Sequence, residues 1–229
     1  MIDIEKITQE VKALLGGGDG HGIDHVLRVR DMAISFAKQE EGVNILIVEL
    51  ASLLHDVDDY KIFGEKSANS LKNATAILSR YQISEDVSRD VLNILMTMGY
   101  SKYLEGIRPL TAEGMIVSDA DMCDAIGAEG ILRTHAYALS KGDLFFDPTL
   151  PPKRPESDAN EYRTMKRSHS VQHFFDKLLI LPSIMMTDAG RDEAQRRKKI
   201  MMDFLNELFR ESDAPEWSKY LEDFIIGGQ

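Results

Sequence analysis

Apolar residues recur three and four positions apart along most of this chain, which is the spacing of one buried face of an α-helix. The first segment with this spacing, residues 3–15, has apolar residues at Ile4, Ile7, Val11, Leu14 and Leu15. No segment alternates apolar and polar residues convincingly over six or more positions, as a half-buried strand would. The pattern therefore predicts an all-α fold.

Residues that start and stop helices divide this pattern into segments. Three glycines at 16–18 end the first helix, and Asp24 and Asn44 are suited to cap the N-termini of the next two. The predicted helices cover residues 3–15, 24–41, 44–56, 67–80, 84–98, 111–125, a continuation to 139 after an interruption at Gly127 and Gly130, then 168–181, 187–211 and 214–224. We expect the two interrupting glycines to allow close helix approach, because G-x-x-G alone is too weak a signal for a phosphate loop.

A chain of 229 residues is long enough for one large domain, or for one domain with a small cap. We expect an N-terminal helix and glycine-rich turn over residues 1–20, a single helical domain over 21–211 and a C-terminal tail over 212–229. Within the domain, residues 141–160 contain four of the seven prolines and have the composition of a loop. A long loop of this kind is either a lid or binding loop, or a solvated excursion without a role.

The charge balance bears on the class of partner. The chain has 27 Lys and Arg residues against 38 Asp and Glu residues, a net charge of −11. Because DNA- and RNA-binding proteins need a basic surface, this balance disfavours nucleic-acid binding. An acidic protein that handles phosphates usually needs a metal ion to neutralise charge locally.

Other features of the sequence predict a cytoplasmic protein. The only cysteine, Cys123, excludes an internal disulfide and fits a reducing compartment. No apolar run reaches 18 residues, so no membrane span is expected, and the acidic N-terminal segment does not resemble a signal peptide. The numerous apolar helices are compatible with a homo-oligomer, although no feature fixes its symmetry.

Three predicted helices each place an imidazole or a carboxylate at the edge of an apolar segment. His55 and Asp56 close the apolar run 50–54, His25 begins another apolar helix, and Asp119 lies among apolar residues. A buried carboxylate is costly unless it has a partner or binds a cation. Two imidazoles and two carboxylates would make a mixed N/O site suited to Mn, Mg, Fe, Co, Ni or Zn. For His55 taken alone, a hydrogen-bonded core histidine is the simpler interpretation.

The order of these residues resembles the HD phosphohydrolase superfamily, whose signature is a histidine, a His-Asp pair and a distant aspartate. The similarity is greater to its small bacterial YedJ/YpgQ-like branch, over roughly residues 15–210. The motifs that carry it are H-x-x-x-H-V-x-R-V from His21, L-L-H-D-V-x-D-Y-K from Leu53, S-D-A-D-x-x-D-A-I-G-A-x-G-I-x-R-T from Ser118 and H-F-F-D-K-L-L-x-L from His173. Met122, Cys123 and His135 depart from the residues usual in relatives, which puts the substrate in doubt and not the metal site.

The resemblance implies an HD-domain helical bundle with one divalent metal ion held by His25, His55, Asp56 and Asp119. It implies hydrolysis of a small phosphorylated substrate by metal-activated water, with a nucleoside triphosphate losing pyrophosphate as the leading candidate. A nucleoside 5′-monophosphate phosphatase is the nearest alternative. A metal-containing nucleotide sensor without turnover is the alternative from another class.

The resemblance and the position of residues also predict further roles around this site. Asp59 is the candidate that orients water or shuttles a proton, with a surface acid as its alternative, whereas Asp58 is expected to be solvated. His21 is a candidate substrate contact or proton donor, or else a loop histidine. The phosphate-binding candidates are Lys61, Arg133 and Lys177, of which the last two could instead pair with Asp121, Asp124 or Asp176.

Asp24 and the pair His169 and His173 each have two interpretations. Asp24 either caps its helix or orients a metal-ligating histidine. His169 and His173 have the i, i+4 spacing of zinc ligands, but no third ligand accompanies them, so a packing or surface role is expected.

Overall fold

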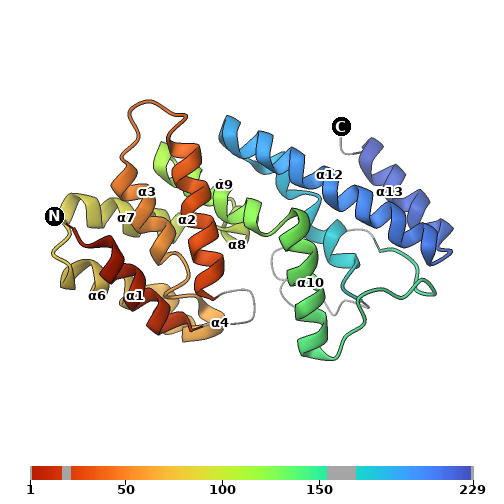
Figure 1. The fold of residues 1–229 in the computed structure, drawn as a ribbon, viewed down its shortest axis with the longest axis horizontal. Helices are drawn as coiled ribbons and strands as arrows, with labels where there is room; N and C mark the ends of the chain where they lie inside the picture. Colours follow the sequence, from red (N-terminus) through yellow and green to blue (C-terminus); the bar gives the residue numbers. More distant parts are fainter. Residues whose placement is uncertain (1, 17–21, 154–168, 228–229) are drawn as a thin grey trace. The chain divides into compact units, whose positions relative to one another are not determined.

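The structure of the protein is a computed structural model that describes residues 2–16, 22–153 and 169–227 (Figure 1). All regular elements of these described residues are helical, which confirms the predicted all-α fold. The contacts between residues group into two compact units, Met1–Asp124 and Ala125–Gln229. In the described ranges, no helix is both long enough and apolar enough to span a membrane.

The first unit contains nine helices in its described residues. They are α1 (Ile4–Leu15), α2 (Ile23–Ala37), α3 (Ile45–Leu54), α4 (Tyr60–Phe63), α5 (Glu65–Ser70), α6 (Lys72–Arg80), α7 (Glu85–Thr97), α8 (Tyr100–Leu104) and α9 (Ala112–Asp124). The core of this unit forms where α2 packs against both α3 and α9 (Figure 1). Its fully buried side chains include Val26 and Val29 of α2, Val48 and Leu50 of α3 and Ile116 of α9. Each buried aliphatic side chain of this kind contributes roughly 1.5–3 kcal/mol, so apolar packing fixes these three helices relative to one another.

The helix ends agree with the sequence in part. Asn44 caps α3 as predicted, since its side-chain oxygen accepts a hydrogen bond of 3.1 Å from the backbone N–H of Leu46. The prediction that Asp24 caps α2 is wrong: Gly22 is the capping residue, and Asp24 is exposed in the first turn. The helix therefore starts before the predicted cap, at Ile23, which is buried.

The predicted helix 67–80 is interrupted. Leu71 has left-handed backbone angles, φ 46° and ψ 46°, and separates α5 from α6. The short helices α4 and α8, of four and five residues, were not predicted because one turn is too short to show a period.

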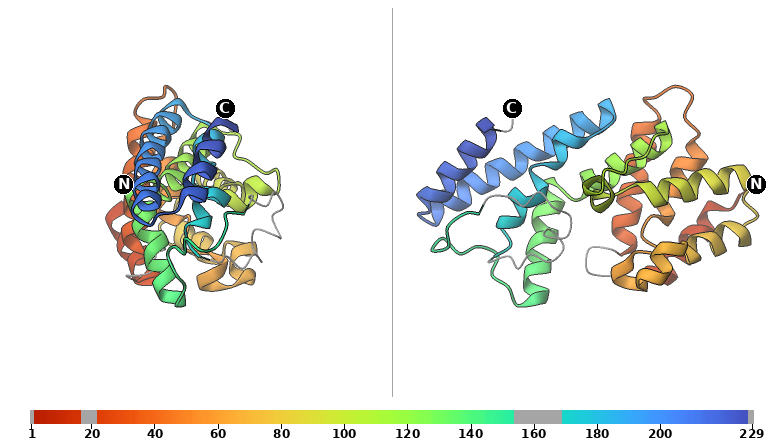
Figure 2. Two further views of the ribbon diagram at one scale, coloured as in Figure 1. Left: turned by 90° about the vertical axis from the view of Figure 1, so that its right-hand side faces the viewer. Right: turned by 180° about the vertical axis from the view of Figure 1, so that it is seen from behind.

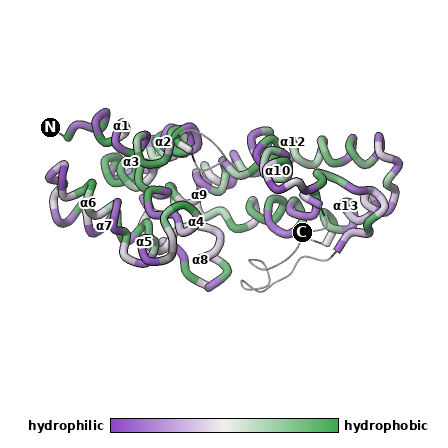
Figure 3. Tube along the Cα trace, turned by 90° about the horizontal axis from the view of Figure 1, so that it is seen from below, coloured by the Kyte–Doolittle hydropathy of each residue, from purple (hydrophilic) through white to green (hydrophobic). Residues whose placement is uncertain are grey.

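The second unit is built around the long helix α12 (Asp188–Glu211), which carries both hydrophobic and hydrophilic residues (Figure 3). The helices α10 (Gly127–Lys141) and α13 (Pro215–Gly227) both pack on it (Figure 2). The predicted α-helix 168–181 is largely wrong: in its described part, from residue 169, the main element is a π-helix at Phe174–Leu178, and a 3-10 helix begins at its end, Leu181–Ile184. The backbone N–H of Leu179 bonds the carbonyl of Phe174 at 2.8 Å, which gives the wider turn.

Both glycines of α10 lie at close approaches, but only Gly127 faces another helix, as predicted for the pair. A Cβ atom on Gly130 would lie 2.3 Å from the carbonyl oxygen of Ala125. Gly127 has φ +79°, and a Cβ atom there would lie 3.0 Å from the side chain of Arg197 on α12. Neither position can therefore accept a side chain without local movement.

The described part of the predicted loop 141–160 is anchored by side chains. Trp217 Nε1 donates to the carbonyl oxygen of Leu150 at 2.8 Å, and the Tyr220 hydroxyl donates to that of Lys153 at 2.7 Å. The Gln172 amide bonds both the N–H and the carbonyl of Lys153, at 3.0 and 2.9 Å. Residues 142–153 could act as a lid only by breaking these bonds, and residues 154–160 lie outside the described part of the chain.

Candidate metal centre

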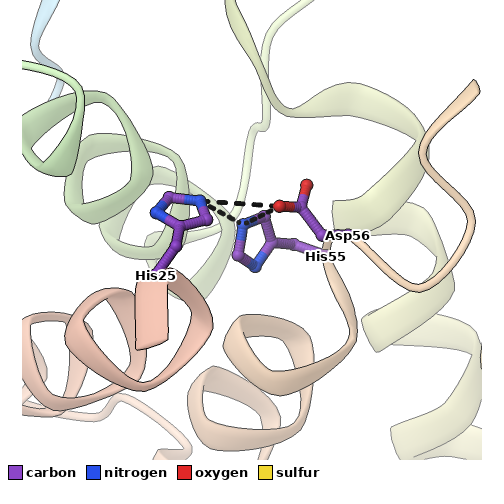
Figure 4. Close-up of side chains that lie close together, drawn as sticks. All are labelled: His25, His55 and Asp56. Atoms are coloured by element: carbon purple, nitrogen blue, oxygen red, sulfur yellow. Dashed lines mark hydrogen bonds and ion pairs between the residues drawn. The ribbon is translucent and has the colours of Figure 1, made fainter. Parts of the chain in front are cut away.

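Two imidazoles and one carboxylate from different parts of the first unit meet at one point (Figure 4). His25 projects from the first turn of α2, and His55 and Asp56 directly follow α3. The Nε2 atoms of the two rings lie 3.1 Å apart. Oδ2 of Asp56 lies 3.6 Å from Nε2 of His25 and 3.5 Å from Nε2 of His55. Because α2 and α3 pack against each other, the apolar core itself brings these groups together.

The outer nitrogen of each ring has an acceptor. Nδ1 of His55 lies 2.8 Å from the backbone carbonyl oxygen of Ser52, and Nδ1 of His25 lies 2.7 Å from Oδ2 of Asp124. A carbonyl or carboxylate oxygen only accepts, so both Nδ1 atoms carry protons in the neutral rings. The Nε2 lone pairs are consequently directed at the same point, where they would repel unless a cation lies between them.

This donor set fits a divalent metal ion. The ligand atoms of His25, His55 and Asp56 all lie within 4.8 Å of one another, and two imidazole nitrogens with a carboxylate oxygen suit Mn, Fe, Co, Ni or Zn. Metal-ligating histidines are usually oriented by a hydrogen bond from their other ring nitrogen, and Asp124 and Ser52 already accept that bond from His25 and His55. Three of the four predicted ligands therefore come together in the structure.

The helix α9 brings a further carboxylate to this point. Oδ1 of Asp121 lies 3.4 Å from Nε2 of His25 and 3.8 Å from Nε2 of His55. The predicted fourth ligand, Asp119, lies two positions earlier on α9 and is completely buried. Positions two apart on an α-helix differ in direction by about 200°, so one helix does not present both carboxylates to the same ring atoms. The geometry therefore favours Asp121 over Asp119 as the carboxylate from α9.

An ion pair between Arg28 and the buried Asp124 supports the side of His25 that faces away from His55. Arg28, one turn further along α2, donates from Nε to Oδ1 of Asp124 at 2.8 Å and from Nη2 to Oδ2 at 2.9 Å. The Asp124 side chain is completely buried, which disfavours its charge, but the hydrogen bonds with His25 and Arg28 outweigh burial and hold its pKa well below the usual range. Burial likewise opposes protonation of His25, but the carboxylates of Asp121 and Asp124 outweigh it and raise the pKa of His25 to about 9. A site that favours a proton so strongly also favours a metal cation.

The turn that follows the histidine-aspartate pair corrects one expectation. Asp58, expected to be solvated, is buried and accepts hydrogen bonds from Ser67 and from the backbone of residues 73 and 74. The backbone N–H of Asp59 bonds the carbonyl oxygen of Asp56 at 3.1 Å, so Asp59 begins a new turn close to the predicted ligand in sequence and space. We name residues 56–59 the HD turn.

The remaining predicted residues have different positions. His21 lies outside the described residues, as does the side chain of Lys61, whose backbone belongs to α4. Arg133 on α10 and Lys177 on the π-helix belong to the second unit. Asp24 is exposed, and the orienting role proposed for it falls to Asp124.

His169 has a packing position, as expected. Its ring is 1% exposed and makes edge-to-face contacts with Trp217 and Phe146, with ring centroids 5.0 and 5.4 Å apart. Neither ring nitrogen has a hydrogen-bond partner among the described residues. Burial, assisted by the charge of Lys153 and opposed by that of Asp147, lowers the pKa of His169 to about 4.

Comparisons with known proteins agree with this arrangement. The family model of the HD domain matches residues 22–126, which include the helices α2, α3 and α9. The uncharacterized protein YpgQ of Bacillus subtilis is 30% identical over 213 residues, which cover 92% of this chain and 93% of YpgQ. The chain belongs to the HD superfamily. The name of this HD superfamily describes the pair that His55 and Asp56 form here.

Solved structures are similar to this chain over most of its length. A crystal structure of a Lactobacillus plantarum protein has a TM-score of 0.79 and 30% identity, and the match covers 93% of this chain and 100% of that one. An HD-superfamily hydrolase from Bacillus thuringiensis has a TM-score of 0.70 and 37% identity, with 92% and 97% covered. YpgQ in complex with ADP has a TM-score of 0.69 and 27% identity, with 91% and 97% covered.

Three roles in this HD site were not predicted from the sequence, namely those of Arg28, Asp121 and Asp124. A signal for the two aspartates was present in the spacing of D-A-D-x-x-D. Asp121 and Asp124 are three residues apart and share one helix face, whereas Asp119 lies on another. For Arg28, the spacing of three from His25 places both on one face of α2, but it does not show which acid they share.

Proposed function

We propose that this HD protein is a metal-dependent phosphohydrolase that acts on a small phosphorylated substrate. The observation that carries the proposal is the convergence of the His25 and His55 Nε2 atoms with the Asp56 carboxylate, while the Nδ1 atom of each ring faces a hydrogen-bond acceptor. The name of the Bacillus thuringiensis relative, HD-superfamily hydrolase, supports a hydrolytic reaction. We assign one divalent ion to the site, with His25, His55 and Asp56 as ligands.

For the fourth protein ligand we assign Asp121 in place of Asp119. The proximity of its carboxylate to both imidazoles supports this choice. A metal ion held by these groups would lower the pKa of a bound water molecule and polarise a phosphoryl oxygen. Asp124 and Arg28 keep the His25 ring in the tautomer whose Nε2 is a ligand, and Ser52 does so for His55.

Asp59 is assigned to the attacking water. It follows Asp56 by three residues in the HD turn, and its backbone N–H bonds the Asp56 carbonyl, which supports a position near the metal ligands. A carboxylate in such a position can accept a proton from water and fix its direction of attack. The oxygen of that water would bond to phosphorus while the bond from phosphorus to the leaving oxygen breaks; Asp59 would hold the proton of the water, and the leaving group would receive a proton. His21 stays a candidate donor of that proton.

The substrate class we propose is a nucleotide, and a nucleoside triphosphate that loses pyrophosphate is the leading member. The crystal structure of YpgQ in complex with ADP supports a nucleotide. Lys61, Arg133 and Lys177 are the proposed phosphate-binding cations. An anionic substrate needs local positive charge on a chain whose net charge is −11. The first alternative is a nucleoside 5′-monophosphate phosphatase, and the second is a sensor that binds nucleotide without turnover.

The experiment that tests this proposal measures phosphate and pyrophosphate release from nucleoside mono- and triphosphates with Mn²⁺, Mg²⁺, Co²⁺ or Ni²⁺. The native chain is compared with Asp56→Ala and with Asp31→Ala, a matched control because Asp31 lies on α2 with a side chain that is 76% exposed. Pyrophosphate release that is lost only in Asp56→Ala supports the leading function. Phosphate release from monophosphates selects the phosphatase, and equal activity in the Asp56→Ala variant would exclude this site as the source of activity.

A further inference from the structure

Asp58 is a charged residue in an unexpected environment. It is 4% exposed, and its carboxylate accepts three hydrogen bonds. Oδ1 accepts from the Ser67 hydroxyl at 2.5 Å and from the backbone N–H of Asn73 at 3.0 Å, and Oδ2 accepts from the backbone N–H of Ala74 at 2.9 Å. Burying a carboxylate is costly, and these three hydrogen bonds offset that cost, so the protein structure holds Asp58 in this position.

One part of that reason is the N-terminus of α6. The residue that precedes this helix, Leu71, has a left-handed backbone and no side-chain cap. The first backbone N–H groups of a helix lack partners within it, and they attract negative charge. Asp58 supplies both an acceptor and a charge, from a position 14 residues before the start of α6.

A second bond joins the same two segments. The side-chain amide of Asn73 donates to the carbonyl oxygen of Val57 at 2.7 Å. Consecutive residues of the HD turn, Val57 and Asp58, are therefore both bonded to the first residues of α6. The candidate ligand Asp56 lies directly before this pair, and Asp59 lies directly after it.

We propose that Asp58 is a positioning residue of the metal centre. By binding the start of α6 it fixes the backbone of the HD turn, and thereby the direction of the Asp56 carboxylate toward the two imidazoles. The Ser67 bond extends the connection to α5, so Asp58 is bonded both to the middle of the excursion 60–71 and to the residues that follow it. This inference rests on the proposed metal-dependent function, because it assigns Asp58 a purpose in holding the metal ligands.

The competing explanation is that Asp58 only stabilises the fold. If Asp58 only stabilises the fold, its replacement lowers the free energy of unfolding but leaves the metal affinity of the folded protein unchanged. Asn44 provides a matched control in the same unit, since it caps α3 at the end opposite to His55 and its loss costs about 1 kcal/mol.

The test is calorimetric titration of Mn²⁺ into the metal-free full chain, at a temperature where thermal unfolding shows every variant to be folded. Asp58→Asn keeps the size of the side chain and replaces one acceptor oxygen by a donor, which faces a backbone N–H. We expect it to weaken Mn²⁺ binding about tenfold, the lower end of the effect of removing an outer-shell partner. We expect Asn44→Ala to bind Mn²⁺ as the native chain does.

The outcomes separate the two proposals. Native affinity in the folded Asp58→Asn variant overturns the positioning role and leaves the proposed function intact. Absence of Mn²⁺ binding by the native chain overturns the metal centre itself. Should Asp58→Asn not fold, Ser67→Ala removes one of the three bonds, and a Mn²⁺ affinity equal to the native value there overturns the inference. Turnover gives a second readout: we expect Asp58→Asn to lower kcat at saturating Mn²⁺ while KM stays near the native value.

Discussion

Nδ1 of His25 lies 2.7 Å from Oδ2 of Asp124, a residue 99 positions away in the sequence. Both oxygens of that carboxylate also accept hydrogen bonds from the guanidinium group of Arg28. In this network the half-buried arginine orients the buried carboxylate, and the carboxylate orients the imidazole. The consequence is that the other ring nitrogen of His25 is directed at His55 and Asp56.

Replacing Asp124 should therefore weaken the metal centre without removing a ligand. In Asp124→Asn the amide no longer selects the His25 tautomer, and Arg28 loses its anionic partner. We expect metal affinity to fall roughly 10- to 100-fold. Titration of Mn²⁺ measures this, with Asp31→Asn on the same helix as the control. A native affinity in Asp124→Asn would show that this network does not orient His25.

The carboxylates of α9 can be distinguished by a pair of variants. We expect Asp121→Asn to lower Mn²⁺ affinity strongly, because its carboxylate lies within 3.8 Å of both imidazole nitrogens. We expect Asp119→Asn to lower the midpoint of thermal unfolding instead, because the residue is completely buried. The reverse result, with affinity lost in Asp119→Asn and kept in Asp121→Asn, would restore the ligand that the sequence predicts.

The role assigned to Asp59 concerns turnover and not binding. We expect Asp59→Asn to reduce kcat by about 10²- to 10⁴-fold, the usual contribution of a positioned acid or base. Mn²⁺ affinity should stay within about twofold of the native value, since the assigned ligands are unchanged. Steady-state kinetics together with calorimetry give both quantities. A native kcat would return Asp59 to the alternative interpretation of a surface acid.

His169 makes a prediction about stability at low pH. The pKa of the buried ring is lowered to about 4, while the unfolded chain binds the proton near the ordinary value of about 6.5. Between these values the unfolded state binds more protons, so the free energy of unfolding decreases as the pH falls from about 6.5 to 4. The loss amounts to at most about 1.4 kcal/mol per pH unit from this group.

The variant His169→Phe tests this origin, because it keeps an aromatic ring against Trp217 and Phe146 and removes the titratable group. Urea unfolding at pH 7, 6 and 5 should show a smaller decrease in stability for His169→Phe than for the native chain. The comparison also cancels the contribution of His25, which is common to both proteins. Parallel decreases in the two proteins would contradict the assignment.

The sequence predicted those parts of the molecule that depend on local patterns. Helical periodicity located most of the long helices, and Asn44 was recognised as a cap from its residue type. The histidine-aspartate pair after an apolar helix, with His25 at the start of another, indicated where a metal would bind. These features persist in the structure because the core of α2, α3 and α9 requires the same apolar faces that make the pattern visible.

Features that depend on distant contacts were not predicted. Nothing local to Asp58 indicates that residues 67, 73 and 74 will bond to it, or that a break at Leu71 will separate α5 from α6. The choice between Asp119 and Asp121 depends on which face of α9 meets α2. The π-helix at Phe174–Leu178 replaces a predicted α-helix in a segment rich in buried aromatic contacts, and the periodicity of the sequence does not reveal it.

The central claim is that His25, His55 and Asp56 hold a divalent metal ion. The most direct test is calorimetric titration of Mn²⁺ into the metal-free native chain, His55→Ala and His135→Ala, the last being an exposed histidine on α10. The account predicts one Mn²⁺ per native chain, the same for His135→Ala, and loss of that binding in His55→Ala. Equal Mn²⁺ binding by the native chain and His55→Ala would contradict it.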